Sequence, residues 1–507
     1  MEINHSLFLF FGGETMTIPS LEDFKGLANR GNLIPIFEEV HFDWETPISA
    51  FRKIDDDRFS FLLESVEGGE KWGRYSFLGS SPAYLFRSKG EEFEIVRNGE
   101  VLRKGREKDP LKVLEGFLGN YRPVLFDSLP RFFGGAVGYI NYDVIRSFER
   151  IPGLLPQAHD LYDCYFMITD TLLVFDNLKH KVKVISNVYL DGQKSLEEAY
   201  QEAQGKIESI IARLQEPVFS SHGNESFSPS PLCSNFKRED FLKAVERAKE
   251  YIKAGDAIQV VLSQRFLSDL HCEPFDIYRA LRSINPSPYL FYLKLDDMVL
   301  LGASPEVMVR LEEGRIELRP LAGTRKRGGT EEKDLAMERD LLADEKEKAE
   351  HIMLVDLGRN DVGRVAEIGS VKVTELMGVE RYSHVMHLVS NIQGALAPGK
   401  NAFDVFRAAF PAGTVSGAPK IRAMQIIEEL EPVRRGPYAG AVGYFSFSGN
   451  MDTCITIRSI LIKDGKAYVQ AGAGIVADSE PEKEYEETLN KAQAIFKAIQ
   501  LAEEGLK

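Results

Sequence analysis

The sequence is poor in cysteine, and its basic side chains are fewer than its acidic ones. Among 507 residues only four are cysteines, and none forms a Cys-x-x-Cys pair. A disulfide framework and a structural zinc site are therefore not expected, and a reducing cytoplasm is the expected location. Lys and Arg number 62 against 77 Asp and Glu, which gives a net charge of −15. Because nucleic acids and anionic membranes both attract basic surfaces, this charge argues against either as a partner.

The chain also lacks a long hydrophobic run near its start. Residues 7–11 form an apolar stretch that is far shorter than a membrane span and has no cationic leader. Met16 precedes a more typical opening, so we expect residues 1–15 to be a disordered extension. The 44% hydrophobic and 27% charged residues are ordinary for a globular protein. The length predicts two or three domains, or two large ones.

A stretch rich in serine and proline divides the chain at residues 216–235. This composition cannot bury a core and indicates a linker. A helix is expected on each side of it, over about 193–214 and 237–254, because apolar residues recur there at helical spacing. We therefore predict an N-terminal regulatory domain over 1–215 and a C-terminal catalytic domain over 236–507, for the functional reasons given below.

Both halves carry signals for antiparallel strands. The pairs Asn98-Gly99 and Asp464-Gly465 lie between apolar runs and predict hairpins. With the long helices, these hairpins favour an α+β fold. The sequence GAVGY occurs at 135–139 and again at 440–444, which indicates closely packed strands rather than duplication. Strands are expected over 132–141, 166–176, 181–188, 257–267, 289–294, 440–447, 454–463 and 466–471.

Two predicted helices near the C-terminus carry pairs of acids. Glu347 and Glu350 lie in the first, and Glu484 and Glu487 lie in the second. A spacing of three places each pair on one helical face. If the two faces met, their carboxylate oxygens would suit Mg²⁺ held partly through water. Solvated faces of amphipathic helices are the alternative.

Three glycine-rich turns accompany these helices, at 321–324, 412–420 and 470–474. Exposed backbone N–H groups in such turns can bind anions. The second turn lacks the spacing of a phosphate-binding loop, so ATP is not predicted. Together the turns and acids predict a small polyanionic substrate held by N–H groups, an arginine and a metal ion. No motif for covalent acyl chemistry is present.

Six motifs, taken in their order along the chain, resemble those of a known enzyme family. They are PLAGT at 320–324, EHIMLVDLGRND at 350–361, SHVMH at 383–387, TVSGAPK at 414–420, DTCITIR at 452–458 and AGAG at 471–474. The chain from about Glu38 onward resembles the chorismate-utilising enzymes, specifically component I of anthranilate synthase, which begins tryptophan biosynthesis. The resemblance implies a two-lobed α+β sandwich of antiparallel sheets packed between helices.

The resemblance also implies a ligand set. Glu350 and Glu487 would bind Mg²⁺, with Glu347 and Glu484 supporting through water, and the metal would bridge to the ring carboxylate of chorismate. Such an ion offsets the charge of a doubly negative substrate in an acidic protein. The implied substrate-binding residues are Gly323, Thr324, Tyr438, Arg458, Gly472, Ala473 and Gly474.

In the implied reaction, ammonia adds at C2 with loss of the C4 hydroxyl, and elimination of pyruvate leaves anthranilate. Glu306 matches the family's general acid. His387 matches the histidine of the elimination step, and Thr414 lies near the ammonia entrance. Gln259 occupies the position where isochorismate-forming relatives carry a lysine that activates water. A glutamine cannot deprotonate water, which fits ammonia as the nucleophile.

Tryptophan feedback is also implied, because Ser65 and the segment Pro288, Tyr289 and Leu290 match the family's inhibitor site. Leu290 is a departure, since relatives often have methionine there. Nothing in the chain resembles a glutaminase, so a separate glutamine amidotransferase subunit is expected, in an assembly of two large and two small subunits.

Several alternatives remain open. In 4-amino-4-deoxychorismate synthase component I, a lysine occupies the position of Ala322 and attacks C2, whereas Ala322 has no amine to offer. A salicylate- or isochorismate-forming enzyme is disfavoured by Gln259. A tryptophan-sensing homologue without catalysis would predict missing acids, yet Glu306 is present. An acidic metal-binding interaction protein would not explain the order of the motifs.

Overall fold

The computed structural model describes residues 17–41, 44–65, 73–153, 155–217, 232–382 and 385–506. The expected extension at 1–15 lies outside the described residues, as do residues 218–231 of the predicted linker. Two 12-stranded sheets form the molecule, and all strand pairs in them are antiparallel. No helix among the described ranges is long and apolar enough to cross a membrane.

The first sheet has a continuous strand order from one half of the chain to the other. In that order it contains β1 (Leu33–Val40), β10 (Lys181–Tyr189), β9 (Thr171–Asp176), β3 (Tyr75–Ser80), β2 (Phe59–Glu64), β13 (Tyr289–Leu295), β14 (Met298–Ser304), β23 (Ser459–Lys463), β24 (Lys466–Ile475), β12 (Gln259–Asp269) and β11 (Cys233–Ser234). The short β20 (Gly417–Ala418) pairs with β12.

The second sheet is built in the same way. It contains β17 (Leu321–Lys326), β19 (Val385–Ala395), β16 (Arg315–Leu318), β15 (Val307–Glu312), β22 (Met451–Ile455), β21 (Ala441–Ser446), β7 (Gly135–Ile140), β8 (Cys164–Thr169), β4 (Tyr84–Lys89), β5 (Glu92–Arg97) and β6 (Glu100–Arg106). β18 (Lys372–Arg381) pairs with β19. The halves of the chain meet at β2–β13 in the first sheet and at β7–β21 in the second.

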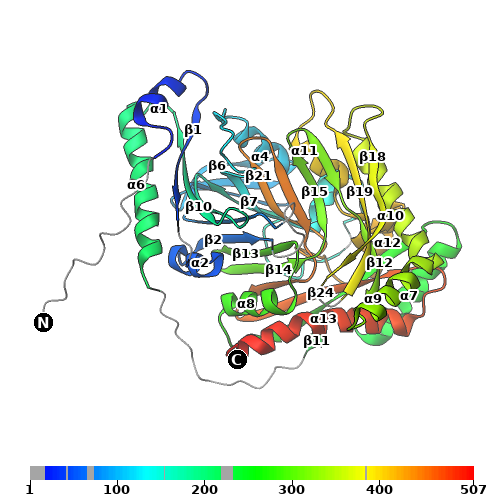
Figure 1. The fold of residues 1–507 in the computed structure, drawn as a ribbon. Helices are drawn as coiled ribbons and strands as arrows, with labels where there is room; N and C mark the ends of the chain where they lie inside the picture. The colour runs from blue at the N-terminus through cyan, green and yellow to red at the C-terminus, as the bar shows by residue number, and fades with distance from the viewer. Residues whose placement is uncertain are drawn as a thin grey trace, which may run out of the picture.

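Helices cover the faces that the sheets turn away from each other (Figure 1). The first sheet carries α1 (Leu21–Leu27), α2 (Pro47–Ile54), α6 (Leu196–Gln215), α8 (Pro274–Ile284) and α13 (Pro481–Glu503), and the β12 end carries α7 (Arg238–Lys253) and α12 (Lys420–Leu430). The second sheet carries α4 (Pro110–Leu118), α9 (Glu331–Ala343), α10 (Glu345–Gly363) and α11 (Ala402–Ala409). The remaining short helices are α5 (Ile145–Phe148), η1 (Tyr142–Val144) and η2 (Gly413–Val415).

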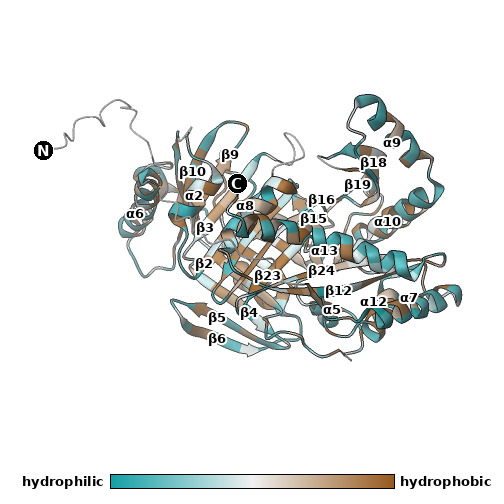
Figure 2. Ribbon diagram, turned by 90° about the horizontal axis from the view of Figure 1, so that it is seen from below, coloured by the Kyte–Doolittle hydropathy of each residue, from teal (hydrophilic) through white to brown (hydrophobic). Residues whose placement is uncertain are grey.

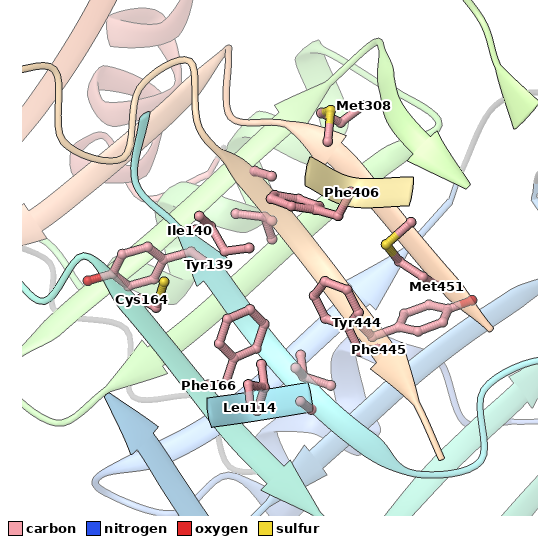
Figure 3. Packing of buried hydrophobic residues seen from close by; sticks show 14 of the residues in the cluster. Leu114, Tyr139, Ile140, Cys164, Phe166, Met308, Phe406, Tyr444, Phe445 and Met451 are labelled. Carbon is pink, nitrogen blue, oxygen red and sulfur yellow. The ribbon is translucent and has the colours of Figure 1, made fainter. Parts of the chain in front are cut away.

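Alternation along the strands explains why both faces of each sheet are apolar. On β21, Tyr444 contacts Phe77 of the first sheet, with ring centroids 5.8 Å apart, whereas the neighbouring Phe445 stacks on Phe403 of α11 at 4.4 Å. Figure 3 shows Tyr444, Phe445 and Phe406 within this packing. Figure 2 shows hydrophobic strands inside and largely hydrophilic outer helices, including α6, α10 and α13. The expected α+β sandwich is confirmed.

Two of the expected strands are wrong in extent. The run at 166–176 is two strands, β8 and β9, and the run at 454–463 is also two, β22 and β23; in each case the chain leaves one sheet for the other. Every one of these strands is buried on both faces, so the apolar runs on either side of Asp170 and of Arg458 look like one continuous strand in the sequence. The second crossing is at Arg458, whose φ is 53°.

The predicted hairpin and repeat are both found in the structure. Asn98 and Gly99 have φ values of 51° and 81°, as a tight two-residue turn between β5 and β6 requires. The two GAVGY segments pair with each other as β7 and β21, with Gly138 opposite Gly443. A Cβ on Gly138 would lie 2.0 Å from the Tyr165 carbonyl oxygen, so close strand packing explains the small residues.

Candidate active site

A cavity of about 280 Å³ lies where β12 and β24 meet the end of β17, β19, α10 and α13. Its walls bring together residues far apart in the sequence. Among them are eleven of the predicted site residues: Gln259, Glu306, Thr324, Glu350, His387, Thr414, Tyr438, Arg458, Gly472, Gly474 and Glu487. Gly323, Ala473, Glu347 and Glu484 are not part of the lining.

The alternation of β24 explains why Ala473 is excluded. Gly472 and Gly474 face the cavity, whereas Ala473 packs into the core under α7 and α12. A Cβ on Gly472 would lie 2.8 Å from the Tyr438 hydroxyl, and one on Gly474 would lie 2.6 Å from Gln259 Nε2. The two glycines therefore allow both polar side chains to approach the strand.

The helices α10 and α13 deliver one carboxylate each to the cavity. Asp344 caps α10 by accepting hydrogen bonds from the first-turn N–H groups, and Pro481 begins α13. Glu350 accepts a hydrogen bond from Gln259 Nε2 at 2.8 Å. Glu487 pairs with Lys491, with 2.6 Å between Oε1 and Nζ. The two acids thus share one cavity.

The second acid of each pair lies behind the first. Burial raises the pKa of Glu347 and of Glu484, and the neighbouring carboxylate of Glu350 or Glu487 raises it further. Glu347 is also in contact with Arg325, at 3.2 Å. Local negative charge is therefore concentrated beside the cavity.

This donor set fits Mg²⁺. Within the ranges that the structure describes, no cluster of three or more His, Cys, Asp or Glu side chains is arranged to hold a metal. Mg²⁺ commonly takes only one or two protein carboxylates and completes its shell with water and substrate oxygens. The Glu350 and Glu487 carboxylates, with acidic neighbours behind them, are donors of that kind.

Glu306 lies at the junction of β14 and β15 and is buried, with 6% of its surface exposed. Burial raises its pKa to about 8, although the nearby Thr414 side chain and Leu321 backbone oppose the shift. The carboxyl group therefore carries a proton at pH 7. A buried, protonated carboxyl beside a cavity can act as a general acid.

His387 is held in one tautomer. Its Nδ1 lies 3.0 Å from the Gly323 carbonyl oxygen and 3.0 Å from Thr324 Oγ1. Because a carbonyl oxygen can only accept, Nδ1 carries the proton and Nε2 is left as an acceptor. Burial lowers the pKa of the ring, with a further contribution from Arg458. The imidazole is thus neutral at pH 7 and can accept a proton.

Arg458 supplies positive charge at the sheet crossing. Burial lowers the pKa of its guanidinium, and the groups that oppose this shift are Tyr438 and Glu487. Its left-handed backbone conformation, with φ at 53°, is the point at which the chain turns from β22 to β23. A partly buried cation on a cavity wall favours an anionic ligand.

Sequence reasoning missed Lys491. This residue lines the cavity, and its Nζ contacts both Glu487 and the Gly472 carbonyl oxygen, the latter at 2.9 Å. Its spacing of four from Glu487 on one helix was the available signal. Lys491 gives the cavity a second cation beside Arg458.

A smaller cavity of about 40 Å³ lies next to the first. The residues predicted to bind tryptophan, Ser65, Pro288, Tyr289 and Leu290, all line it. The Tyr289 hydroxyl donates to Asp452 at 2.8 Å. The preceding residues of the same segment, 285–287, line the larger cavity. One loop therefore forms a wall of both cavities.

Known proteins resemble this chain over most of its length. A family model described as chorismate binding enzyme matches residues 59–497. The chain is 50% identical over 495 residues to anthranilate synthase component 1 of Acetivibrio thermocellus, covering 96% of this chain and 100% of that protein. It is 51% identical over 489 residues to the protein of the same name from Aquifex aeolicus, covering 96% and 98%.

A solved structure is similar as well. The crystal structure of anthranilate synthase component I from Streptococcus pneumoniae superposes with a TM-score of 0.76 at 38% identity, covering 90% of this chain and 98% of that one. The chain therefore belongs to the chorismate-binding enzymes. Within this family, the three relatives just described are all component I of anthranilate synthase, which confirms the resemblance expected from the motifs.

Proposed function

We propose that the chain is the large subunit of an anthranilate synthase, which converts chorismate and ammonia into anthranilate and pyruvate. The observation that carries this proposal is the convergence, in one cavity, of a protonated acid, a neutral histidine, two carboxylates and two cations. The near-full-length likeness to proteins named anthranilate synthase component 1 supports the same substrate.

Binding of chorismate draws on the cations and on a metal. Glu350 and Glu487 would hold Mg²⁺, with Glu347 and Glu484 behind them, and the ion would supply positive charge for the ring carboxylate. Arg458, Tyr438 and the N–H groups at 472–474 hold the enolpyruvyl side. Thr324 borders the ring and also fixes His387, together with the Gly323 carbonyl oxygen.

The two chemical steps use different residues. Ammonia forms a bond to C2, the two ring double bonds each move one position along the ring, and the C4 hydroxyl leaves as water with the proton of Glu306. The ammonium group formed at C2 then gives up a proton. In the second step His387 Nε2 takes the proton from C2 while the C3–O bond breaks, and the ring becomes aromatic. The leaving group departs as the enolate of pyruvate and takes up a proton to become pyruvate. Thr414, which lines the cavity near Glu306, lies beside the path of ammonia.

The rival reactions of the family find less support in the cavity. Ala322 lines it and has no amine with which to attack C2. Gln259 donates its amide N–H to Glu350 and cannot serve as a base for water. Direct attack by ammonia, with the ortho amine as product, fits both positions.

The proposal is tested by a fluorescence assay of the purified chain. We expect chorismate, Mg²⁺ and ammonium at mildly alkaline pH to give fluorescent anthranilate, and omission of Mg²⁺ to abolish it. Glutamine should replace ammonium only when an amidotransferase subunit is added. Formation of isochorismate or of 4-amino-4-deoxychorismate instead would assign the chain to a rival branch, and unreacted chorismate would refute catalysis.

The smaller cavity is the tryptophan feedback site of this proposal. The Ser65 hydroxyl accepts a hydrogen bond from the ammonium group of tryptophan, and the loop with Pro288, Tyr289 and Leu290 contacts the rest of the tryptophan molecule. This loop also borders the chorismate cavity, so inhibitor binding can lower substrate affinity. The N-terminal half is then regulatory, and the cytoplasmic complex pairs two large with two small subunits.

A substitution separates the two sites. Ser65→Arg should fill the smaller cavity, whose volume is only about 40 Å³, and should remove tryptophan inhibition while ammonia-dependent turnover persists. The measurement is the rate against tryptophan concentration at fixed chorismate. Ser65→Ala is the matched control, because it removes the hydroxyl without filling the space and should only weaken inhibition. Undiminished inhibition in Ser65→Arg would refute the assignment.

A further inference from the structure

A fully buried ion pair lies behind the wall of the larger cavity. Arg435 and Glu431 follow α12, their side chains are each 1% exposed, and Nη2 lies 2.6 Å from Oε1. Neither residue lines the cavity. Burial of two charges is costly unless every polar atom finds a partner, so the partners of this pair show what it holds in place.

The remaining N–H groups of Arg435 reach two separate cavity segments. Nη1 donates to the Val415 carbonyl oxygen at 2.7 Å, and Nη2 donates to the Val261 carbonyl oxygen at 2.7 Å. Val415 follows Thr414, and Val261 lies on β12; both line the cavity. The guanidinium also lies 5.7 Å from the centre of the Tyr438 ring.

Glu431 connects the ion pair by hydrogen bonds to β12 and, through Ser263, to β24. Its Oε1 accepts from the Ser263 backbone N–H at 2.9 Å and from the Ser263 hydroxyl at 2.8 Å. Gln470, a lining residue of β24, donates to Ser263 Oγ at 2.8 Å and accepts from Arg265 Nε at 3.1 Å. Arg265 closes the ring by donating to the Arg435 carbonyl oxygen at 3.0 Å.

We propose that Arg435 and Glu431 are positioning residues that set the Thr414 turn, β12, β24 and Tyr438 at fixed distances from one another. The inference rests on the proposed function, because the positions that it fixes are those of the substrate-binding and ammonia-side groups. Besides Glu431, the Arg435 guanidinium donates to the main-chain carbonyl oxygens of Val415 and Val261. One side chain therefore connects two separate segments of the cavity wall. Displacing such segments by about 1 Å can lower the catalytic rate roughly 10²-fold.

The test compares Arg435→Lys, Glu431→Gln and Ser263→Ala with the control Arg422→Lys. Arg422 is an ion-paired arginine of α12, the helix that precedes the pair, and it contacts Asp256 away from the cavity. Assays run well below each melting temperature. We expect KM for chorismate to rise about tenfold or more in the first two variants, with a smaller fall in kcat and an unchanged pH profile. Ser263→Ala should show the same pattern more weakly, and Arg422→Lys should match the parent.

Hydrogen–deuterium exchange gives a readout that needs no activity. Amides in 412–416 and 436–440 should exchange at least about tenfold faster in Glu431→Gln and measurably faster in Ser263→Ala, but not in Arg422→Lys. Unchanged exchange and KM in folded variants would overturn the positioning role. If the parent chain forms no anthranilate, the proposed function fails, and exchange alone then decides the positioning role. If Arg435→Lys does not fold, Ser263→Ala decides it.

Discussion

Replacing Glu306 with glutamine is expected to lower kcat for anthranilate formation roughly 10²- to 10⁴-fold, the usual contribution of a general acid. Glutamine keeps the shape of the side chain but cannot give a proton to the departing C4 hydroxyl. Burial supports the role, because it raises the pKa of Glu306 to about 8 and keeps the carboxyl protonated at neutral pH. KM for chorismate should change little, since the proton is needed only as the bond breaks.

The pH dependence of kcat/KM gives a second, independent test of the role of Glu306. A carboxyl with a pKa near 8 holds its proton below that pH and loses it above, so kcat/KM should fall as pH rises through about 8. The measurement keeps the concentration of free ammonia fixed, so that the nucleophile does not vary. Glu306→Gln should lack this fall, whereas Glu313→Gln, an exposed acid at the β15–β16 turn, should retain it. A Glu306→Gln variant within about threefold of the parent rate would exclude the acid role.

Glu487→Gln is expected to weaken Mg²⁺ binding by at least about 100-fold, because it removes one of the two carboxylates that face the cavity. Glu350→Gln should behave alike, since the two acids are proposed to hold one ion. The rate is measured against Mg²⁺ concentration, and calorimetry with chorismate but no ammonia measures binding without turnover.

The control for this experiment lies one residue away. Glu486 is an exposed acid of α13 that does not line the cavity, and Glu486→Gln changes the net charge equally. It should leave the Mg²⁺ requirement within about twofold of the parent, as expected for a surface substitution. Equal losses in Glu486→Gln and Glu487→Gln would mean that general charge, rather than a metal site, governs the response.

Local patterns in the sequence anticipated the elements that carry the site. Helical periodicity located α10 and α13, and the spacing of the acid pairs placed Glu350 and Glu487 on them. The expected strands at 166–176 and 454–463 failed at the crossings between sheets, because an apolar strand looks the same in either sheet. The consequence was that Arg458 was expected within a strand, whereas it lies at a turn.

Energetic properties of the site were beyond sequence reasoning. The family resemblance identified Glu306, but its raised pKa comes from burial by segments that are distant in the chain. Likewise Glu431 and Arg435 look like part of a charged helix end, and only the packing of β12 against α12 places them in the interior. Desolvation is a tertiary property, so local patterns cannot report it.

The shared sheets also limit how the chain can be divided. Cutting between residues 216 and 235 would expose β2 and β7 on one fragment and β13 and β21 on the other, each with a row of unpaired backbone groups. Such bare edges favour self-association. Replacement of one half by an unrelated domain during evolution is therefore restricted. Any new domain would have to supply edge strands that pair with the remaining half in both sheets at once.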